Sequence, residues 1–184
     1  TGVQTCALPI LGNKFIMYVG RHQPHKNLER LIEAHQKLLE KSPELILAIV
    51  GKKDGVTELL EKKVTKKSYK NIVFTGFVTD GQLRWLYENT GCYVFPSLSE
   101  GFGLPGLEAM VHGAPVASSN ATCLPEIYGD AANYFDPKNV DDMADKIGEI
   151  ISDENLRKTL IDKGYSQANK YSWQRMAEQT LAVY

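Results

Sequence analysis

Short apolar runs recur along the chain, and longer segments with a helical period separate them. The runs are continuously apolar rather than alternating, which is typical of strands buried on both faces of a parallel sheet. Gly20 and Gly51 close the first two runs, as expected at strand ends. We expect six strands, in the segments KFIMYVG, ELILAIVG, NIVFTGFV, CYVFPS, PVASSN and NYFDP.

The segments between the runs predict helices. Asn27 is suited to cap the first helix, and Thr79 or Asp80 to cap a short amphipathic one. Ser172 suits the start of the last helix, and the whole tail from about residue 140 is helical in pattern. The apolar face of the first helix is made by Leu28, Leu31, Ile32, His35, Leu38 and Leu39.

This alternation predicts a doubly wound α/β domain, with a parallel Rossmann-like sheet covered on both faces. Ligands of such folds bind outside the carboxyl ends of the strands, in the loops that lead into helices. Glu126 lies in one of these loops, and its role stays open, with helix capping as the favoured interpretation. The loops to inspect are Arg21–Asn27, Gly51–Gly55, Gly76–Gly81, Pro96–Pro105 and Ser118–Glu126.

The composition of the chain limits the classes of function that it can have. The chain has 184 residues, of which 43% are apolar and 23% charged, and its formal net charge is −1. This balance gives no general case for nucleic acid as a partner. No apolar run is long enough to span a membrane. The cysteines show no metal spacing, and Cys92 opens an apolar strand, where we expect a buried thiol of a protein in a reducing cytosol.

The ends of the chain do not fit the pattern. The start, TGVQTCALPI, shows neither period and lacks the features of a signal peptide. We interpret residues 1–12, with Cys6, as a foreign or disordered start. The last residues stop inside a helical pattern, so we expect this chain to be a piece of a larger protein.

The loop GRHQPHKN carries the first candidate chemistry. Arg21 and Lys26 lie between a strand end and a helix start, where two cations suit a diphosphate. The alternative is that both are solvated surface residues. His22 and His25 have an H-x-x-H spacing, but this pair alone is weak evidence for a metal, and we expect none.

The loop EGFGLPGLE carries the second group of residues with candidate chemistry. Gly101, Gly103 and Gly106 would let three nearly free N–H groups approach an anion. A helix starting near Leu104, with Pro105 in its first turn, would aim its dipole at the same place.

The two carboxylates of that loop are acceptors, which suit sugar hydroxyls rather than phosphate. We expect Glu100 to take hydroxyls of a transferred sugar and Glu108 those of a ribose. The alternatives are that Glu100 caps the helix and that Glu108 is an ordinary exposed helix residue.

The segment YVFPSLSEGFGLPGLEAMVHGAPVASSNATCLPEIYGDAANYFDP strongly resembles the carboxyl-terminal half of retaining glycosyltransferases of the two-Rossmann-domain (GT-B) type, family 4. Glu100 and Glu108 match the family's pair of glutamates separated by seven residues. The segment YVGRHQPHKNLERLIEAH resembles its basic donor-phosphate segment. The resemblance covers roughly Phe15–Tyr184, and it implies that residues 13–184 form the nucleotide-sugar-binding domain.

The resemblance implies a metal-independent reaction without a cofactor. It implies that Arg21 and Lys26 meet the leaving diphosphate, that Glu100 and the following loop hold the sugar, that Glu108 holds the ribose and that the base lies near Phe77. We therefore expect catalytic roles for Arg21, Lys26 and Glu100. The expected donor-binding residues are Gly20, Phe77, Val78, Gly101, Phe102, Gly103, Leu104, Pro105 and Glu108.

The resulting hypothesis is the donor-binding domain of a hexosyltransferase that uses a GDP- or UDP-sugar, of mannose or glucose type, in polysaccharide biosynthesis. Its expected partners are an N-terminal Rossmann domain missing here and an acceptor saccharide or lipid-linked sugar, so the fragment alone should be inactive. The expected location is cytoplasmic or at the inner face of the membrane. The alternatives are a non-catalytic nucleotide-sugar-binding module and a phosphorylase of the same fold.

A basic helix is the feature that suggests a peripheral membrane contact. The helix is expected over roughly Thr57–Lys67, and anionic lipid would meet its lysines. Glu58 and Glu61 dilute the charge, which favours an ordinary solvated face. The lysines concerned are Lys62, Lys63, Lys66 and Lys67.

Overall fold

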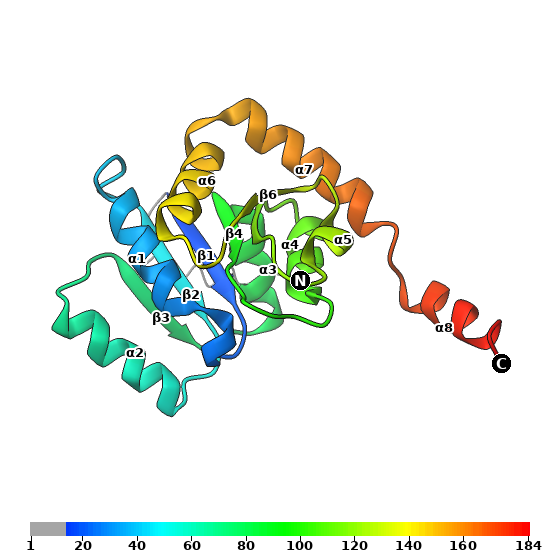
Figure 1. The fold of residues 1–184 in the computed structure, drawn as a ribbon, viewed down its shortest axis with the longest axis horizontal. Coiled ribbons are helices and arrows are strands. Elements are labelled where there is room, and N and C mark those ends of the chain that lie inside the picture. The colour runs from blue at the N-terminus through cyan, green and yellow to red at the C-terminus, as the bar shows by residue number, and fades with distance from the viewer. Residues whose placement is uncertain (1–13) are drawn as a thin grey trace, which may run out of the picture.

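The computed structural model describes residues 14–184, and the interpretation of residues 1–12 and Cys6 lies outside them. Six parallel strands form one sheet in the order β3-β2-β1-β4-β5-β6, which confirms the predicted doubly wound fold (Figure 1). The strands are β1 (Phe15–Val19), β2 (Ile46–Val50), β3 (Ile72–Gly76), β4 (Cys92–Phe95), β5 (Val116–Ser119) and β6 (Ala132–Phe135).

The strand order reverses between β1 and β4. β1 pairs with β2 along its whole length, from Phe15 opposite Ile46 to Val19 opposite Val50, and with β4 on its other edge. The chain therefore leaves β1 toward one half of the sheet and leaves β4 toward the other. Such a reversal opens a crevice at the carboxyl ends of the two strands.

Helices cover both faces of this sheet. In Figure 1, α1 and α6 lie in front of it and α3 and α4 behind; α6 packs on α1 and α7 on α4. The helical segments are η1 (Pro24–Lys26), α1 (Leu28–Leu38), α2 (Gly55–Lys66), α3 (Asp80–Asn89), α4 (Leu104–Val111), α5 (Leu124–Tyr128), α6 (Val140–Ser152), α7 (Glu154–Ala168) and α8 (Trp173–Leu181).

Side-chain caps fix where several of these helices begin. Thr79, rather than Asp80, caps α3 in a reciprocal capping box with Gln82. Ser172 caps α8 by accepting a hydrogen bond from the Arg175 N–H, as predicted. Asp54 caps α2 in the same reciprocal manner as Thr79, although the sequence pattern did not point to it.

The prediction that Asn27 caps α1 is wrong. Asn27 has φ 59° and makes no side-chain cap. Its buried amide donates instead to the carbonyl oxygens of Pro96, at 3.0 Å, and Pro137, at 2.7 Å. The reason is that these two carbonyls need the two donors of an amide, while the left-handed backbone turns the chain into α1. Asn27 thereby ties together the loops that follow β1, β4 and β6.

His35 is the polar member of the predicted apolar face of α1. It is fully buried, its Nε2 lies 3.0 Å from the Leu45 carbonyl, and Gln36 meets its Nδ1 at 3.1 Å. A neutral ring with a proton on Nε2 satisfies both contacts. Burial lowers the pKa of His35 to about 4, so this histidine stays neutral in the core.

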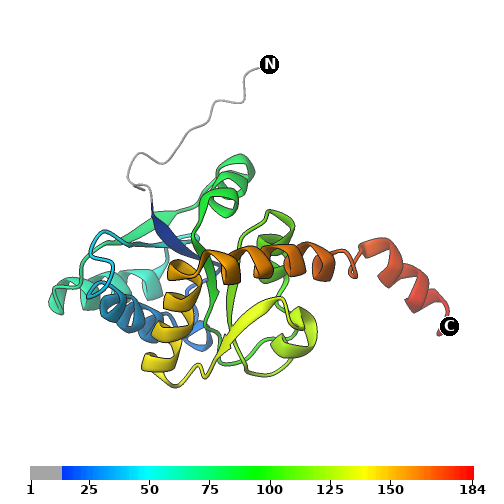
Figure 2. The same cartoon turned by 90° about the horizontal axis from the view of Figure 1, so that it is seen from above.

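The last helix contributes nothing to the core. α8 has no buried residue, and Trp173 and Leu181 are 71% and 76% exposed. Figure 2 shows α8 extending beyond the body of the domain.

Cys92 lies in β4 and is fully buried, as predicted, and burial raises the pKa of its thiol to about 12. Within residues 14–184 no helix combines the length and apolar character needed to cross a bilayer. The lysines at the end of α2 are partly paired, since Lys63 contacts Glu29 of α1 and the C-cap residue Lys67 contacts Glu33 of α1.

Candidate functional site

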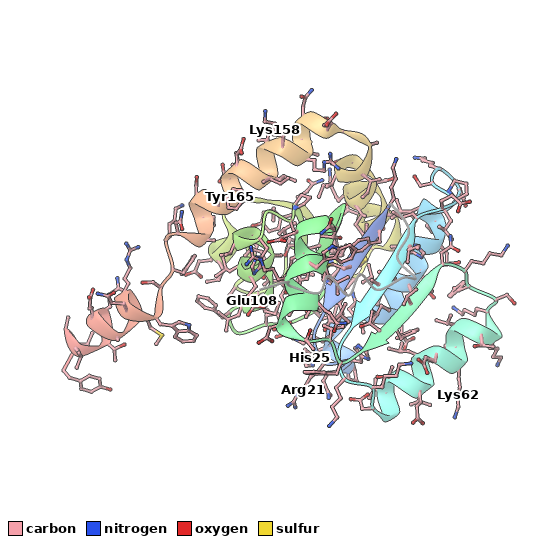
Figure 3. All side chains as sticks on the ribbon, turned by 180° about the vertical axis from the view of Figure 1, so that it is seen from behind. Arg21, His25, Lys62, Glu108, Lys158 and Tyr165 are labelled. Atoms are coloured by element: carbon pink, nitrogen blue, oxygen red, sulfur yellow. The ribbon has the colours of Figure 1, made fainter. Side chains whose placement is uncertain are left out.

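The candidate site is built from the loops that follow β1 and β4, on either side of the strand reversal. We call them the basic loop (Gly20–Asn27) and the glycine loop (Pro96–Gly103). The Leu98 N–H donates to the His25 carbonyl at 2.8 Å, which joins the two backbones directly. Figure 3 shows Arg21, His25 and Glu108 toward the same end of the sheet.

The backbone of the basic loop is anchored at its start. The Gly20 N–H donates to the Val50 carbonyl at 3.0 Å, and the Tyr18 hydroxyl donates to the Arg21 carbonyl at 2.9 Å. Burial raises the pKa of Tyr18, with Glu100 adding to the effect, so the phenol remains a donor. The Arg21 side chain is exposed. A fixed backbone therefore carries a guanidinium that is open to solvent.

The central contact of the site is an ion pair between the two loops. The Lys26 Nζ donates to the Glu100 Oε1 at 2.5 Å, and only 18% and 12% of these side chains are exposed. The ammonium also lies 5.7 Å from the centroid of the Phe95 ring. Lys26 is thus not the solvated surface residue of the alternative interpretation. Glu100 is not a helix cap either, because Gly103 is the N-cap residue of α4 and no side chain caps this helix.

The glycine loop turns closely over a buried tyrosine. Gly103 has φ 93°, and the Tyr128 hydroxyl donates to its carbonyl at 2.6 Å. A Cβ added at Gly103 or at Gly106 would collide with that hydroxyl. Both positions therefore require glycine because of Tyr128, and Gly103 also because of its backbone conformation.

The prediction of three free N–H groups needs correction at Gly106. Its N–H donates to the Gly103 carbonyl at 3.1 Å because Gly106 already belongs to the first turn of α4. Among residues 14–184, no acceptor meets the main-chain N–H of Gly101, Phe102 or Gly103. Nothing lies within 4 Å of a Cβ added at Gly101. The open donors are therefore those of Gly101, Phe102 and Gly103, and Gly106 is not among them.

Glu108 lies in α4 and is exposed, as the alternative interpretation of this residue required. The buried Tyr87 hydroxyl of α3 lies 3.4 Å from both the Glu108 Oε2 and the Pro105 carbonyl oxygen. Burial raises the pKa of Tyr87, and the Glu108 carboxylate raises it further. Glu108 is therefore available to solvent on one side and steadied by a phenol on the other.

The remaining predicted residues lie in the loops that follow β3 and β4 and at the start of α4. Phe77 is 81% exposed and follows β3 at the edge of the sheet, and Val78 packs against the core. Leu104 is 46% exposed at the start of α4. The Phe102 ring meets that of Tyr171, 5.5 Å between centroids. No contact among residues 14–184 brings Phe77 to the ion pair.

Two further residues, in the loop between β5 and α5, hold the main chain of Glu100. The Thr122 Oγ1 accepts a hydrogen bond from the Glu100 N–H at 3.1 Å, and the Cys123 Sγ donates to the Glu100 carbonyl at 3.3 Å. Sequence reasoning missed both because no motif marks them.

Glu126 is exposed in α5, which begins without a side-chain cap, so its interpretation as a capping residue is wrong.

The two histidines of the basic loop have different surroundings. His22 is buried, with its Nδ1 2.6 Å from the Thr57 Oγ1, whereas His25 is exposed. Burial lowers the pKa of His22, against the opposing effect of Asp54. Residues 14–184 contain no group of three or more His, Cys, Asp or Glu that could hold a metal ion.

A cavity of about 580 Å³ lies between α1, α2 and the basic loop, and neither Lys26 nor Glu100 is among its lining residues. His22, Leu28 and Leu60 are among its lining residues, and the paired Lys63 and Glu29 line its rim. Its polar lining mixes both charges and shows no preference for an anion. The chemistry of the site is concentrated instead at the junction of the basic and glycine loops, where cations, open N–H groups and a carboxylate suit an anion joined to a polyhydroxyl group.

Comparison with known proteins gives concordant matches. The family model described as "Glycosyl transferases group 1" matches residues 8–167. The O-antigen chain mannosyltransferase B of Escherichia coli is 36% identical over 174 residues, which are 92% of this chain and 45% of that protein. The MMP alpha-(1->4)-mannosyltransferase of Mycolicibacterium hassiacum is 33% identical over 178 residues, 94% of this chain and 43% of that protein.

A solved structure of similar size also matches. It is the C-terminal domain of a glycosyl transferase group 1 family protein from Francisella tularensis, with a TM-score of 0.75, 32% identity and 86% of each chain covered. The chain spans less than half the length of the two mannosyltransferases.

Proposed function

The chain belongs to the glycosyl transferases group 1 family, and from this premise we propose that it is the donor-binding domain of a retaining, metal-independent hexosyltransferase of the GT-B type. The donor is a GDP- or UDP-sugar. The named mannosyltransferases among its relatives favour mannose over glucose. The observation that carries the proposal is the 2.5 Å pair between Lys26 and Glu100, which puts a cation for phosphate beside an acceptor for sugar hydroxyls.

The proposed roles of the cations follow from where charge develops as the sugar–phosphate bond of the donor breaks. Breaking the bond between the anomeric carbon and the diphosphate oxygen leaves the bonding electrons on the diphosphate and positive charge on the carbon. Lys26, Arg21 and the open N–H groups of the glycine loop stabilise that leaving group. Donors fixed in advance lower such a barrier most, and the loss of one costs about 100- to 1,000-fold in rate in a comparable oxyanion site.

The carboxylates divide the rest of the donor between them. Glu100, released by Lys26 when phosphate takes its place, accepts hydroxyls of the transferred sugar. Glu108 accepts those of the ribose, with Tyr87 fixing one of its oxygens. Phe77 and Val78 provide a surface for the base. Each role requires only groups that already lie at the carboxyl ends of β1, β3 and β4.

The proposed partner is an N-terminal domain of the same protein, because the chain spans less than half of its relatives. That domain brings the acceptor, a saccharide or a lipid-linked sugar, and covers the exposed apolar side chains of α8. Transfer therefore needs both domains, in a polysaccharide-building enzyme at the cytoplasmic side of the membrane. Pairing of Lys63 and Lys67 with acids favours a solvated α2 over a lipid-binding one.

A thermal-shift titration tests donor binding without the second domain. GDP or UDP should raise the melting temperature of this chain by mass action, and GMP or UMP should raise it much less, since they lack the second phosphate. Equal shifts with the monophosphates, or none with either diphosphate, would contradict the proposal.

In the full-length enzyme, Arg21→Ala and Lys26→Ala should each lower the rate of sugar transfer about 100- to 1,000-fold while the protein stays folded.

A further inference from the structure

The loop between β5 and α5 grips the main chain of Glu100 on both sides. Thr122 accepts from its N–H and the next residue, Cys123, donates to its carbonyl, at 3.1 Å and 3.3 Å. The carboxylate of the same residue is held from the opposite direction by Lys26. Glu100 is therefore fixed at three points, and two of them come from a loop that carries none of the residues assigned to the donor.

Thr122 holds this position in an unfavourable backbone conformation. Its φ is 54°, and the other non-glycine residues with positive φ among residues 14–184 are Asn27, Ser68 and Asn71. Thr122 is the β-branched member of this group, and such side chains avoid the left-handed region most strongly. A conformation of this kind persists only where surrounding contacts require it.

The surroundings of Thr122 are rigid enough to impose that conformation. The Ser119 hydroxyl accepts from the Ala121 N–H at 3.0 Å, just before Thr122. Just after it, Leu124 is fully buried, and Tyr128 of the same short helix is bonded to Gly103. The loop is thus clamped on both sides of Thr122, and its hydroxyl is presented to the Glu100 peptide from a fixed place.

We propose that Thr122 is a positioning residue for Glu100, and that through Glu100 it sets the preference of the site for a sugar-carrying nucleotide over the bare nucleoside diphosphate. The inference rests on the proposed function of Glu100. The physical reason is that Thr122 holds the N–H of the Ser99–Glu100 peptide, and the orientation of that peptide aims the Glu100 carboxylate. A peptide that rotates loses the hydroxyl contacts of the sugar but leaves the phosphate contacts of Arg21 in place.

The experiment measures two affinities of the 184-residue chain by calorimetry, one for GDP-mannose or UDP-glucose and one for GDP or UDP. Thr122→Val removes the acceptor and keeps the shape of the side chain. It should weaken binding of the sugar nucleotide about two- to tenfold, the worth of one hydrogen bond, and change that of the bare diphosphate less than about twofold. Thr122→Ser, which keeps the hydroxyl, should restore the sugar-nucleotide affinity.

Two further variants keep the result interpretable. Thr122→Gly removes the hydroxyl and relieves the strained backbone, so it should fold well and show the same selective loss. Thr79→Val removes the hydroxyl that caps α3 and should leave both affinities unchanged. Equal weakening of both ligands, or unchanged selectivity in Thr122→Val and Thr122→Gly, would overturn the inference. A wild-type chain that binds neither diphosphate would instead overturn the proposed function itself.

Discussion

The basic loop and the glycine loop meet at one end of the sheet but are held in place in different ways. The basic loop supplies an anchor from within itself, since the Asn27 amide donates to the carbonyls of Pro96 and Pro137. The glycine loop is fixed by residues from later in the chain, chiefly Tyr128 and Thr122. A loop that must display cations can carry its own anchor, whereas a loop of small residues takes its shape from its neighbours.

The largest effect should come from the anchor of the basic loop. Asn27→Ala leaves two buried carbonyls without donors and keeps a left-handed backbone, which together cost about 3 kcal/mol or more of unfolding free energy. Asn71 is the matched control, because it also has positive φ and donates to a proline carbonyl, that of Pro43, but is exposed. Asn71→Ala should cost about 1 kcal/mol.

Urea unfolding checks this pair of variants, with the change in midpoint read at constant m-value. Equal losses in Asn27→Ala and Asn71→Ala would mean that the buried bridge adds nothing, and that the basic loop is held from elsewhere.

A smaller effect should separate two glycines of the same segment. A Cβ at Gly106 collides with Tyr128, whereas one at Gly101 meets nothing within 4 Å. Gly106→Ala should therefore lower the unfolding free energy by about 1–3 kcal/mol through overpacking, even though alanine favours the helix by up to about 1 kcal/mol. Gly101→Ala should change it by about 0.5 kcal/mol or less. The melting temperatures of both variants test this difference. A Gly106→Ala variant that is more stable than the wild type would show that Tyr128 does not shape this loop.

The smallest effect concerns the ion pair that joins the loops. In the free chain the Glu100 carboxylate is paired with the Lys26 ammonium, the cation that a diphosphate needs. Glu100→Gln removes that competition and the repulsion of phosphate, so GDP or UDP should bind about two- to fivefold more tightly while GDP-mannose or UDP-glucose binds less tightly. Calorimetry with both ligands measures the change. Weaker binding of the bare diphosphate would show that Glu100 supports Lys26 rather than competing for it.

The same contrast explains how far the sequence could be interpreted. The six strands and the two loops follow from continuous apolar runs and from glycine, lysine and glutamate at strand ends, all of which are local signals. The capping of α3 and α8 was also predicted, because a cap and its helix are neighbours in the chain. Local pattern was sufficient for these elements, although it missed the equally local capping box of Asp54 on α2.

Contacts between distant segments were not predictable in this way. Asn27 looked like a cap because asparagine before a helix usually is one, but its partners lie 69 and 110 residues away. Gly106 looked like a phosphate-binding glycine, and Tyr128, which explains its presence, lies on another helix. Thr122 gave no signal at all, since neither its positive φ nor its contact with Glu100 follows from residue type.

The central claim is that the basic and glycine loops form a single anion site. The most direct test is the affinity of the chain for GDP or UDP in Arg21→Ala, Lys26→Ala and, as a control, Lys62→Ala, whose side chain lies to one side on α2 (Figure 3). We predict at least about tenfold weaker binding for the first two variants, because each loses a charge-assisted contact, and no change for the third. Unchanged affinity in Arg21→Ala and Lys26→Ala, or an equal loss in Lys62→Ala, would contradict the account.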